Sequence, residues 1–368
     1  MEITSRPTRS NSRTTSPLPH RIVVVGGGAG GLELVTRLGD QFGRHGKAHV
    51  VLVDRMATHL WKPLLHEVAA GSMDPNAHQL EYIAQARWHH FEFLQGELLD
   101  LDRADKTITV AGILDENRNP ILPKRAIPYD TLILAIGSVT NFFGVPGAAE
   151  HAMAIDTVSQ AEQVRKRILA ACMRSQARLA QSDGQLLQKV NLVIIGGGAT
   201  GVELAAELRN TAQVLAAYGL HQLDPRRDIQ ITLIEAGPRI LPPLPERIAS
   251  ETARLLAQLN VDIITADKVT EITPDAVLTG SGRRLPSDLT VWAGGIKIPA
   301  VLGRIGLPTN SLGQVSVSPT LQSITDPDIF ALGDCASCAW ADTGKFVPPR
   351  AQAAHQQASL LLTSMHCR

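Results

Sequence analysis

Two glycine-rich stretches of nearly identical sequence constrain this 368-residue chain more than any other feature. VVGGGAGGLEL begins at Val24, and IIGGGATGVELAAEL begins at Ile194, 170 positions later. In both copies a run of Val and Ile leads into glycines spaced G-x-G-x-x-G, and a helix-forming segment follows. The spaced glycines are Gly26, Gly28 and Gly31 in the first copy and Gly196, Gly198 and Gly201 in the second. This duplication predicts an α/β protein with two Rossmann-like dinucleotide-binding domains.

The glycine positions have separate physical roles in such a turn. The first permits the sharp strand-to-helix turn, the second lets a pyrophosphate approach the backbone, and the third lets helix and strand pack closely. Free N–H groups and the positive helix end then meet the phosphate charge. Gly-rich turns without a ligand are the alternative reading. Because each copy lies between a strand and a helix, we favour two bound dinucleotides.

An acidic residue ends the strand that follows each glycine loop, Asp54 in the first copy and Glu235 in the second. A carboxylate at this position suits the ribose hydroxyls of an adenosine. It also repels a 2′-phosphate, so NADH is favoured over NADPH in the second copy. Arg239, four residues after Glu235, weakens that preference.

Composition excludes several classes of protein. The chain has 44% hydrophobic and 19% charged residues, and its 35 Lys+Arg balance its 35 Asp+Glu, so no nucleic-acid partner is expected. No apolar run approaches the roughly 18 residues of a membrane span. Four cysteines are too few for a disulfide framework, which favours a reducing, cytoplasmic setting. Residues 1–19, rich in Ser, Thr, Arg and Pro, predict a disordered tail, with a transit peptide as the alternative.

The apolar pattern predicts further elements along the chain. The first unit has strands at 21–25 and 49–53 around a helix at 29–43, and short strands over 91–128 predict a small antiparallel layer. The second unit has strands at 190–195 and 229–234 around a helix at 199–218. The remaining predictions are strands within 131–138, 288–295 and 328–334, and helices at 157–180, 246–259 and 350–362.

Together with the two glycine loops, the segments YDTLILAIGS (129–138) and DIFALGDCA (328–336) resemble the pyridine nucleotide-disulfide oxidoreductases. The resemblance implies FAD in the first loop and NADH in the second, with the NADH domain inserted in the FAD domain. The expected divisions are 20–150 and 297–368 for FAD, the latter with a partial quinone site, and 151–296 for NADH. Asp334 matches the aspartate that binds the flavin ribityl chain. The other cofactor-binding residues that the resemblance implies are Gly137, Gly295 and Gly333.

Within that superfamily, HLWKPLLHEVAAG (59–71) is similar to the flavin-lining segment of the type II NADH dehydrogenases, with Pro63 and Leu64 against the cofactor. LIEAGPRILP, VWAGGIK and PPRAQAAHQQA are further matches. The family passes hydride from NADH to FAD and then electrons to a quinone, without pumping protons. The resemblance therefore implies NADH and quinone as partners, a homodimer, and peripheral contact at the cytoplasmic face of the inner membrane.

The same resemblance supplies catalytic candidates. The family has a glutamate at the position of Glu203 that relays protons beside the flavin and quinone; an acid stabilised by the helix N-terminus is the simpler reading. Gln352, His355 and Gln356 match the segment that lines the family's quinone pocket. An Ala/Gln-rich helix of good propensity is the alternative there. Lys62 and His66 receive no role.

Cysteine positions narrow the chemistry. Residues 55–85 contain no cysteine, which excludes a disulfide reductase with a redox-active pair near the flavin. Cys335 and Cys338 form one CxxC pair, which cannot complete a four-thiolate zinc site, so we expect a packing role and no metal, with a redox role as the alternative.

Two further functions remain open from the sequence. One is an NADH-dependent reductase of a ferredoxin or rubredoxin, and the other is a flavin- and nucleotide-binding protein without turnover. Relatives normally continue beyond the last predicted helix into membrane-binding segments, whereas this chain stops at SLLLTSMHCR, so we expect a C-terminal truncation.

Overall fold

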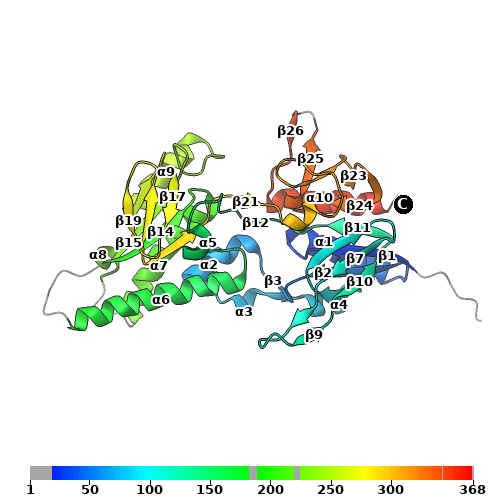
Figure 1. Cartoon of the computed structure of the whole chain (residues 1–368), viewed down its shortest axis with the longest axis horizontal. Coiled ribbons are helices and arrows are strands. Elements are labelled where there is room, and N and C mark those ends of the chain that lie inside the picture. The colour runs from blue at the N-terminus through cyan, green and yellow to red at the C-terminus, as the bar shows by residue number, and fades with distance from the viewer. Residues whose placement is uncertain (1–18, 182–188, 219–223, 342, 367–368) are drawn as a thin grey trace, which may run out of the picture.

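The computed structural model describes residues 19–181, 189–218, 224–341 and 343–366, and these form two lobes (Figure 1). The predicted tail at 1–19 lies outside the described residues except for Pro19. One lobe is built on a nine-stranded sheet and the other on a five-stranded sheet. The prediction of two Rossmann-like domains is confirmed.

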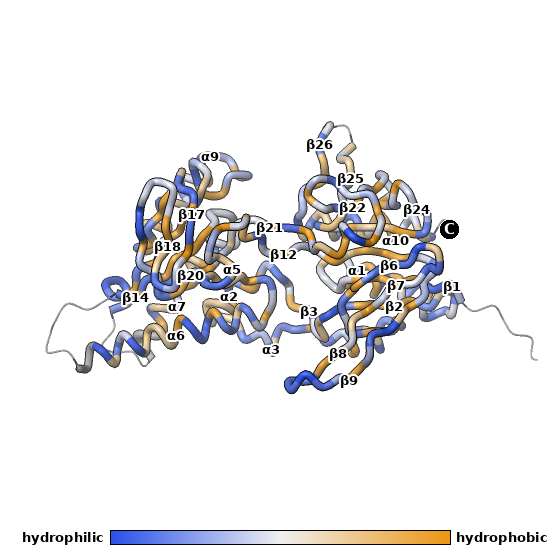
Figure 2. The backbone as a smooth tube through the Cα atoms, in the orientation of Figure 1, coloured by the Kyte–Doolittle hydropathy of each residue, from blue (hydrophilic) through white to orange (hydrophobic). Residues whose placement is uncertain are grey.

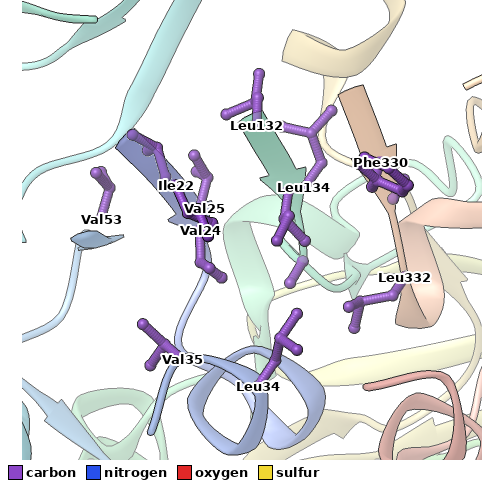
Figure 3. Close-up of a cluster of buried hydrophobic side chains, with 14 of the residues drawn as sticks. Ile22, Val24, Val25, Leu34, Val35, Val53, Leu132, Leu134, Phe330 and Leu332 are labelled. Atoms are coloured by element: carbon purple, nitrogen blue, oxygen red, sulfur yellow. The ribbon is translucent and has the colours of Figure 1, made fainter. Parts of the chain in front are cut away.

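The first lobe is centred on β1 (His20–Val25), which lies between β2 (Ala48–Asp54) and β11 (Thr131–Leu134). All three strands run parallel, and Val24 pairs with Leu52 on one side and Ile133 on the other. Helix α1 (Ala29–Leu38) follows β1 and continues into a π-helical turn (Gly39–Gly43). Buried side chains of these strands and of α1 form the hydrophobic core shown in Figure 3. Every side chain along β11 is buried in this core.

The chain returns to this sheet after the second lobe, which confirms the predicted insertion. β24 (Asp326–Ala331) pairs parallel with β11, and α10 (Ala351–Met365) packs against α1. The remaining strands of the nine-stranded sheet are β5 (Glu92–Gln95), β22 (Val315–Val317), β23 (Gln322–Ser323), β25 (Ala336–Trp340) and β26 (Lys345–Phe346). Short 3-10 turns lie at Ala300–Gly303 and Gly333–Cys335.

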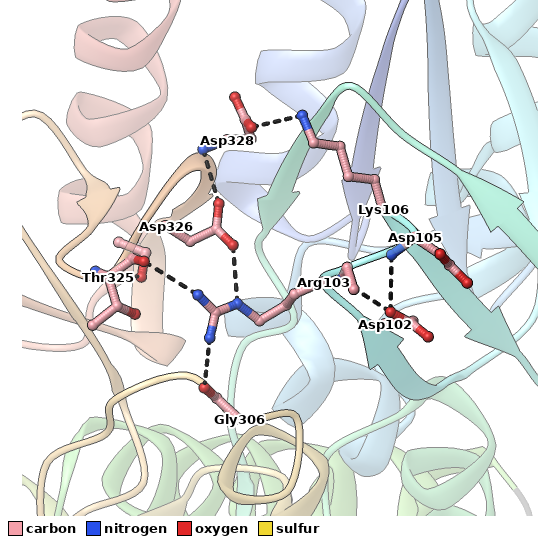
Figure 4. Close-up of polar contacts among 10 residues, drawn as sticks. Asp102, Arg103, Asp105, Lys106, Gly306, Thr325, Asp326 and Asp328 are labelled. Carbon is pink, nitrogen blue, oxygen red and sulfur yellow. Dashed lines mark hydrogen bonds and ion pairs between the residues drawn. The ribbon is translucent and has the colours of Figure 1, made fainter.

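The predicted antiparallel layer is a three-stranded sheet that covers part of the first lobe. It consists of β6 (Leu98–Asp102), β7 (Thr107–Val110) and β10 (Arg125–Pro128), and a hairpin of β8 (Ile113–Leu114) and β9 (Pro120–Leu122) extends from it. Two ion pairs tie this layer to the returning chain (Figure 4): Arg103 Nε lies 2.9 Å from Asp326, and Lys106 Nζ lies 2.7 Å from Asp328.

The second lobe is a parallel sheet in the order β13-β20-β14-β15-β16. Its strands are β13 (Ala152–Ala154), β14 (Val190–Ile195), β15 (Ile229–Ile234), β16 (Val261–Ile264) and β20 (Leu289–Trp292). Its helices are α6 (Val158–Gln181), α7 (Ala199–Tyr218), α8 (Pro225–Asp228) and α9 (Glu246–Gln258). An antiparallel sheet of β17 (Val269–Ile272), β18 (Ala276–Thr279) and β19 (Arg284–Pro286) lies beside it.

The two lobes are joined by a strand pair and by helix packing, in addition to the two places where the chain passes from one lobe to the other. β12 (Val139–Thr140) pairs antiparallel with β21 (Ile296–Lys297) where the chain passes between them. The 3-10 turn Lys62–Leu64 and helix α2 (Leu65–Ala70) belong to the first lobe by sequence, yet α2 packs against α6 and α7 in the second (Figure 1). The segment then returns to the first lobe through α3 (Pro75–His78), β4 (Leu80–Glu81) and α4 (Tyr82–Trp88), with β4 paired to β3 (Thr58–His59).

The predicted boundary at residue 151 lies inside the second lobe. Ala148, in α5 (Ala148–His151), is fully buried with Val193 and Trp292, and Phe142 and Val145 pack against the same cluster. The second lobe therefore begins near β12.

Figure 2 shows apolar segments along the central strands of both lobes and a hydrophilic tip on the β8–β9 hairpin. Among the described residues, the structure contains no helix with both the length and the apolar character needed to cross a membrane.

Candidate functional site: two dinucleotide cradles

The first glycine loop, here called the first cradle (Gly26–Gly31), has the geometry that its sequence predicts. Gly26 has φ +105°, and a Cβ there would lie 2.4 Å from the Ala135 carbonyl oxygen. A Cβ on Gly31 would lie 1.8 Å from the Gly26 carbonyl oxygen. By contrast, a Cβ on Gly28 would meet nothing within 4 Å. Protein packing therefore requires the outer glycines Gly26 and Gly31, whereas a side chain on the middle glycine would meet open space.

The second glycine loop, the second cradle (Gly196–Gly201), repeats this geometry. Gly196 has φ +113°, and its Cβ would lie 2.6 Å from Gly294 Cα. A Cβ on Gly201 would lie 1.9 Å from the Gly196 carbonyl oxygen, and one on Gly198 would meet nothing within 4 Å. The two loops are therefore equivalent in shape, and the backbone alone does not distinguish their ligands.

The two predicted acids hold the loops in the same way. Asp54 accepts hydrogen bonds from Gly27 N at 2.5 Å and from Met56 N at 2.8 Å. Glu235 accepts from Gly197 N at 2.7 Å and from Gly237 N at 2.6 Å. Burial raises the pKa of Asp54, and its two backbone donors oppose that rise. Each acid thus holds the glycine between the first two spaced glycines of its cradle, Gly27 or Gly197.

Asp334 lies in the 3-10 turn that follows β24, beside Ser138 in the segment that follows β11. Ser138 Oγ donates to Asp334 Oδ2 at 2.5 Å, and Gln314 Nε2 donates to the Asp334 carbonyl oxygen at 2.8 Å. Gly333 N donates to Gln357 Oε1 at 2.7 Å. The structure therefore brings the predicted Gly333–Asp334 turn next to the segment after β11, where Gly137 has φ +76°.

A pocket of about 370 Å³ opens at the second cradle. Its lining includes Gly196, Glu235, Asp267 and Trp292. Gly295 belongs to the lining and has φ +76°; a Cβ there would lie 2.3 Å from the ring of Phe143, which also lines the pocket. The pocket combines aromatic and apolar walls with carboxylates, which suits an adenosine with free ribose hydroxyls.

The guanidinium of Arg239 is hydrogen-bonded to the backbone of its own loop. Its guanidinium donates to the carbonyl oxygens of Leu241, Pro242 and Leu244 at 3.1, 2.7 and 2.9 Å. Three backbone partners therefore hold Arg239 within its own loop. The effect of Arg239 on the choice between NADH and NADPH stays a prediction.

Glu203 lies just after the first turn of α7, and its exposed carboxylate lies near His66 of α2. Its Oε2 is 3.6 Å from Nδ1 of His66, which in turn lies 2.7 Å from the Pro63 carbonyl oxygen. Pro63 and Leu64 lie in the turn just before α2. The segment predicted to line the flavin and the predicted proton-relay glutamate therefore meet between the lobes.

Lys62 belongs to this meeting point, although the sequence analysis gave it no role. Its Nζ donates to the Ser138 carbonyl oxygen at 3.1 Å and to Asp156 at 3.0 Å. Asp156 also accepts from Thr140 N at 2.9 Å. Lys62 thus links the segment that is predicted to line the flavin to residues on both sides of β12.

The three predicted quinone residues lie on exposed faces of α10. His355 Nδ1 pairs with Glu33 of α1, and Glu33 also pairs with Arg37 at 3.1 Å. Gln352 and Gln356 are exposed. The structure gives His355 a partner between helices, and the quinone roles of Gln352, His355 and Gln356 stay predictions.

Cys335 and Cys338 are buried, and their thiols contact backbone carbonyl oxygens. Burial raises the pKa of Cys335 to about 11, so its thiol stays protonated at neutral pH. These contacts support a packing role for the pair.

The fold and the paired cradles define a class of protein, and comparison with known proteins agrees. Residues 20–358 match the family "pyridine nucleotide-disulphide oxidoreductase", and the chain belongs to that family. Within it, the chain is a member of the type II NADH:quinone oxidoreductases. It is 42% identical to the type II NADH:quinone oxidoreductase of Haemophilus influenzae over 92% of this chain and 78% of that protein.

Other relatives agree with this assignment. The chain is 26% identical to the type II NADH:quinone oxidoreductase of Staphylococcus aureus, over 92% of this chain and 79% of that protein. Among solved structures, it resembles NDH2 from Plasmodium falciparum in complex with NADH, with a TM-score of 0.80 and 20% identity over 94% of this chain and 83% of that one.

Proposed function

We propose that the protein oxidises NADH and reduces a quinone, with FAD held in the first cradle as its resident cofactor. The observation that carries this proposal is the pair of equivalent cradles in a chain 42% identical to a type II NADH:quinone oxidoreductase. Bound FAD would supply the redox chemistry that couples the two half-reactions.

The residues of the first lobe fit FAD. Open space at Gly28 leaves room for the pyrophosphate, and Asp54 lies where an adenosine ribose is bound in this fold. Asp334 and Ser138 form a hydrogen-bonded pair at the ends of two adjacent parallel strands, which is where the ligands of such sheets bind.

The second cradle would hold NADH. Gly198 leaves the corresponding space open, and Glu235 presents its carboxylate to the pocket. Because that carboxylate repels a 2′-phosphate and Arg239 is held by backbone carbonyls, we infer selectivity for NADH over NADPH. The exposed carboxylate of Glu203 is suited to exchanging protons near the junction of the lobes.

An anaerobic titration with NADH tests this function. We expect the purified protein to be yellow, and one equivalent of NADH to bleach its flavin absorbance. Adding a short-chain quinone should restore the absorbance, and repeated cycles should consume NADH in proportion to quinone. A yellow protein that NADH does not bleach would instead be a binding protein without turnover, and the proposal would fail.

The choice of acceptor separates quinone reduction from the alternative of a ferredoxin or rubredoxin reductase. Reduced protein mixed with either acceptor should be reoxidised faster by the quinone, and faster reoxidation by ferredoxin would reverse the assignment. The homodimer and peripheral contact at the cytoplasmic face of the inner membrane stay predictions. Sedimentation analysis and fractionation of cells test them.

A further inference from the structure

The first cradle differs from the second in what fixes its central peptide group. The Gly27 carbonyl oxygen accepts a hydrogen bond from Tyr82 Oη at 2.7 Å and lies 2.9 Å from Nδ1 of His59. In the second cradle the equivalent oxygen, on Gly197, accepts from the backbone N of Leu241 at 2.7 Å. The carbonyl oxygen at this position is therefore held by two side chains in the first cradle and by a backbone N–H in the second.

The two side chains are themselves well fixed. Tyr82 is 2% exposed, its ring centroid lies 5.1 Å from that of Phe93, and its hydroxyl oxygen lies 2.4 Å from the place where a Cβ on Gly27 would stand. His59 and Tyr82 flank a two-stranded ribbon, since β3 ends at His59 and β4 ends just before Tyr82. Burial lowers the pKa of His59, which favours the neutral imidazole, and a proton on Nδ1 would let that ring donate to the Gly27 carbonyl oxygen.

A peptide group is planar and trans, so its C=O and N–H point in opposite directions. The Gly27 carbonyl and the Gly28 N–H belong to one peptide group. Two donors on the carbonyl therefore direct the Gly28 N–H away from His59 and Tyr82 and polarise it. A Cβ on Gly28, the residue that carries this N–H, would meet nothing within 4 Å.

We propose that His59 and Tyr82 are positioning residues for FAD, which act through the Gly27–Gly28 peptide group to aim an N–H at the cofactor's pyrophosphate. The inference rests on the proposed FAD site and concerns how firmly that site retains its cofactor. It also separates the two cradles, because the donor to the second is the Leu241 backbone N–H, which any residue other than proline keeps.

The test uses purified holoprotein, with flavin release followed on dilution by the rise of free-flavin fluorescence. We expect Tyr82→Phe and His59→Phe each to raise the FAD dissociation constant about fivefold, the effect of one lost hydrogen bond. The double variant should exceed the product of the two, because the carbonyl then loses both side-chain donors. The dissociation constant for NADH should stay unchanged in all three.

Tyr129→Phe is the matched control. Tyr129 is also buried in the first lobe, at 3% exposed, and belongs to the layer near Lys106 rather than to the cradle. Its variant should retain FAD like the wild type. Equal FAD affinity in the wild type and the double variant would overturn the inference, even if thermal stability falls. Wild-type protein that binds no FAD would instead overturn the proposed function.

Discussion

Single residues in this chain divide into those that a local pattern reveals and those that only the fold brings into place. The glycines and the two acids were predictable because a turn of this shape needs them at fixed spacing. Gln357, which accepts a hydrogen bond from Gly333 N, was not singled out. A signal was available: Gln357 lies with Ala354, Ala358 and Leu361 on the buried, helically spaced face of α10, whereas the three predicted residues are exposed.

The exposed carboxylate of Glu203 carries the first prediction. We expect Glu203→Gln to lower the turnover number with quinone by about 10- to 100-fold, because the amide cannot exchange protons, while FAD stays bound. Steady-state kinetics with a short-chain quinone measures the effect. Glu207→Gln, one turn further along α7, is the matched control and should change turnover by less than about twofold. Unchanged quinone reduction in Glu203→Gln would reject the proton-relay role.

His59 carries a prediction about pH. Its pKa is lowered in the folded protein from the ordinary 6.5, so below that pH the unfolded chain binds a proton that the folded protein does not. The His59 contribution to the free energy of unfolding is therefore complete above pH 6.5 and is lost as the pH falls. Asp54 interacts electrostatically with His59, and its carboxyl group is present in both wild type and the His59→Phe variant. The titration of Asp54 therefore contributes to the stability of both proteins.

Urea denaturation at a series of pH values between about 5 and 8 checks this sign. The difference in the free energy of unfolding between wild type and His59→Phe should narrow as the pH falls below 6.5, the ordinary pKa of histidine. Parallel curves for the two proteins would contradict the prediction.

At the scale of elements, both βαβ units were predicted because hydrophobic runs, glycine spacing and strand-end acids agree within one short segment. The position of α2 was not predictable. Its sequence LHEVAA has an apolar face that could cover either lobe, and only the three-dimensional path brings Leu65 and Val68 against α6 and α7. Lys62 and Tyr82 were missed for the same reason, since their partners lie far away in sequence.

The two loop elements support a prediction that separates their ligands. Gly28 has φ −68°, and the space around Gly28 and Gly198 admits a Cβ, so an alanine at either position should leave the unliganded fold intact. Each added methyl would instead occupy the phosphate position. We expect Gly28→Ala to weaken FAD binding and Gly198→Ala to weaken NADH binding, each by about tenfold or more.

Flavin retention and NADH titration, run on both variants, measure these effects. Each variant serves as the control for the other, because only one ligand should be affected in each. The reverse pattern would exchange the assignments of the two cradles.

At the scale of the whole molecule, the lobes are joined by packing as well as by β12 and β21. Leu65 is 4% exposed within the core of the second lobe. We expect Leu65→Ala to lower the free energy of unfolding by about 2–5 kcal/mol, because it leaves a cavity between α2 and its neighbours. Leu80→Ala, at a position that is 45% exposed, is the control and should change stability by less than about 0.5 kcal/mol.

Chemical denaturation followed by fluorescence and by circular dichroism measures both variants. A loss in Leu65→Ala no larger than in Leu80→Ala would show that α2 contributes little to the second lobe.

Because α2 packs against the second lobe, this protein cannot be cut into two independent fragments at the sequence borders of its lobes. A fragment cut at the obvious sequence borders, such as 151–296, would lose the side chains of Leu65 and Val68 and expose the apolar surfaces of α6 and α7 that they cover. We expect such a fragment to aggregate rather than fold as a separate nucleotide-binding module. Swapping the inserted unit between relatives should therefore succeed only when the α2 segment is transplanted with it.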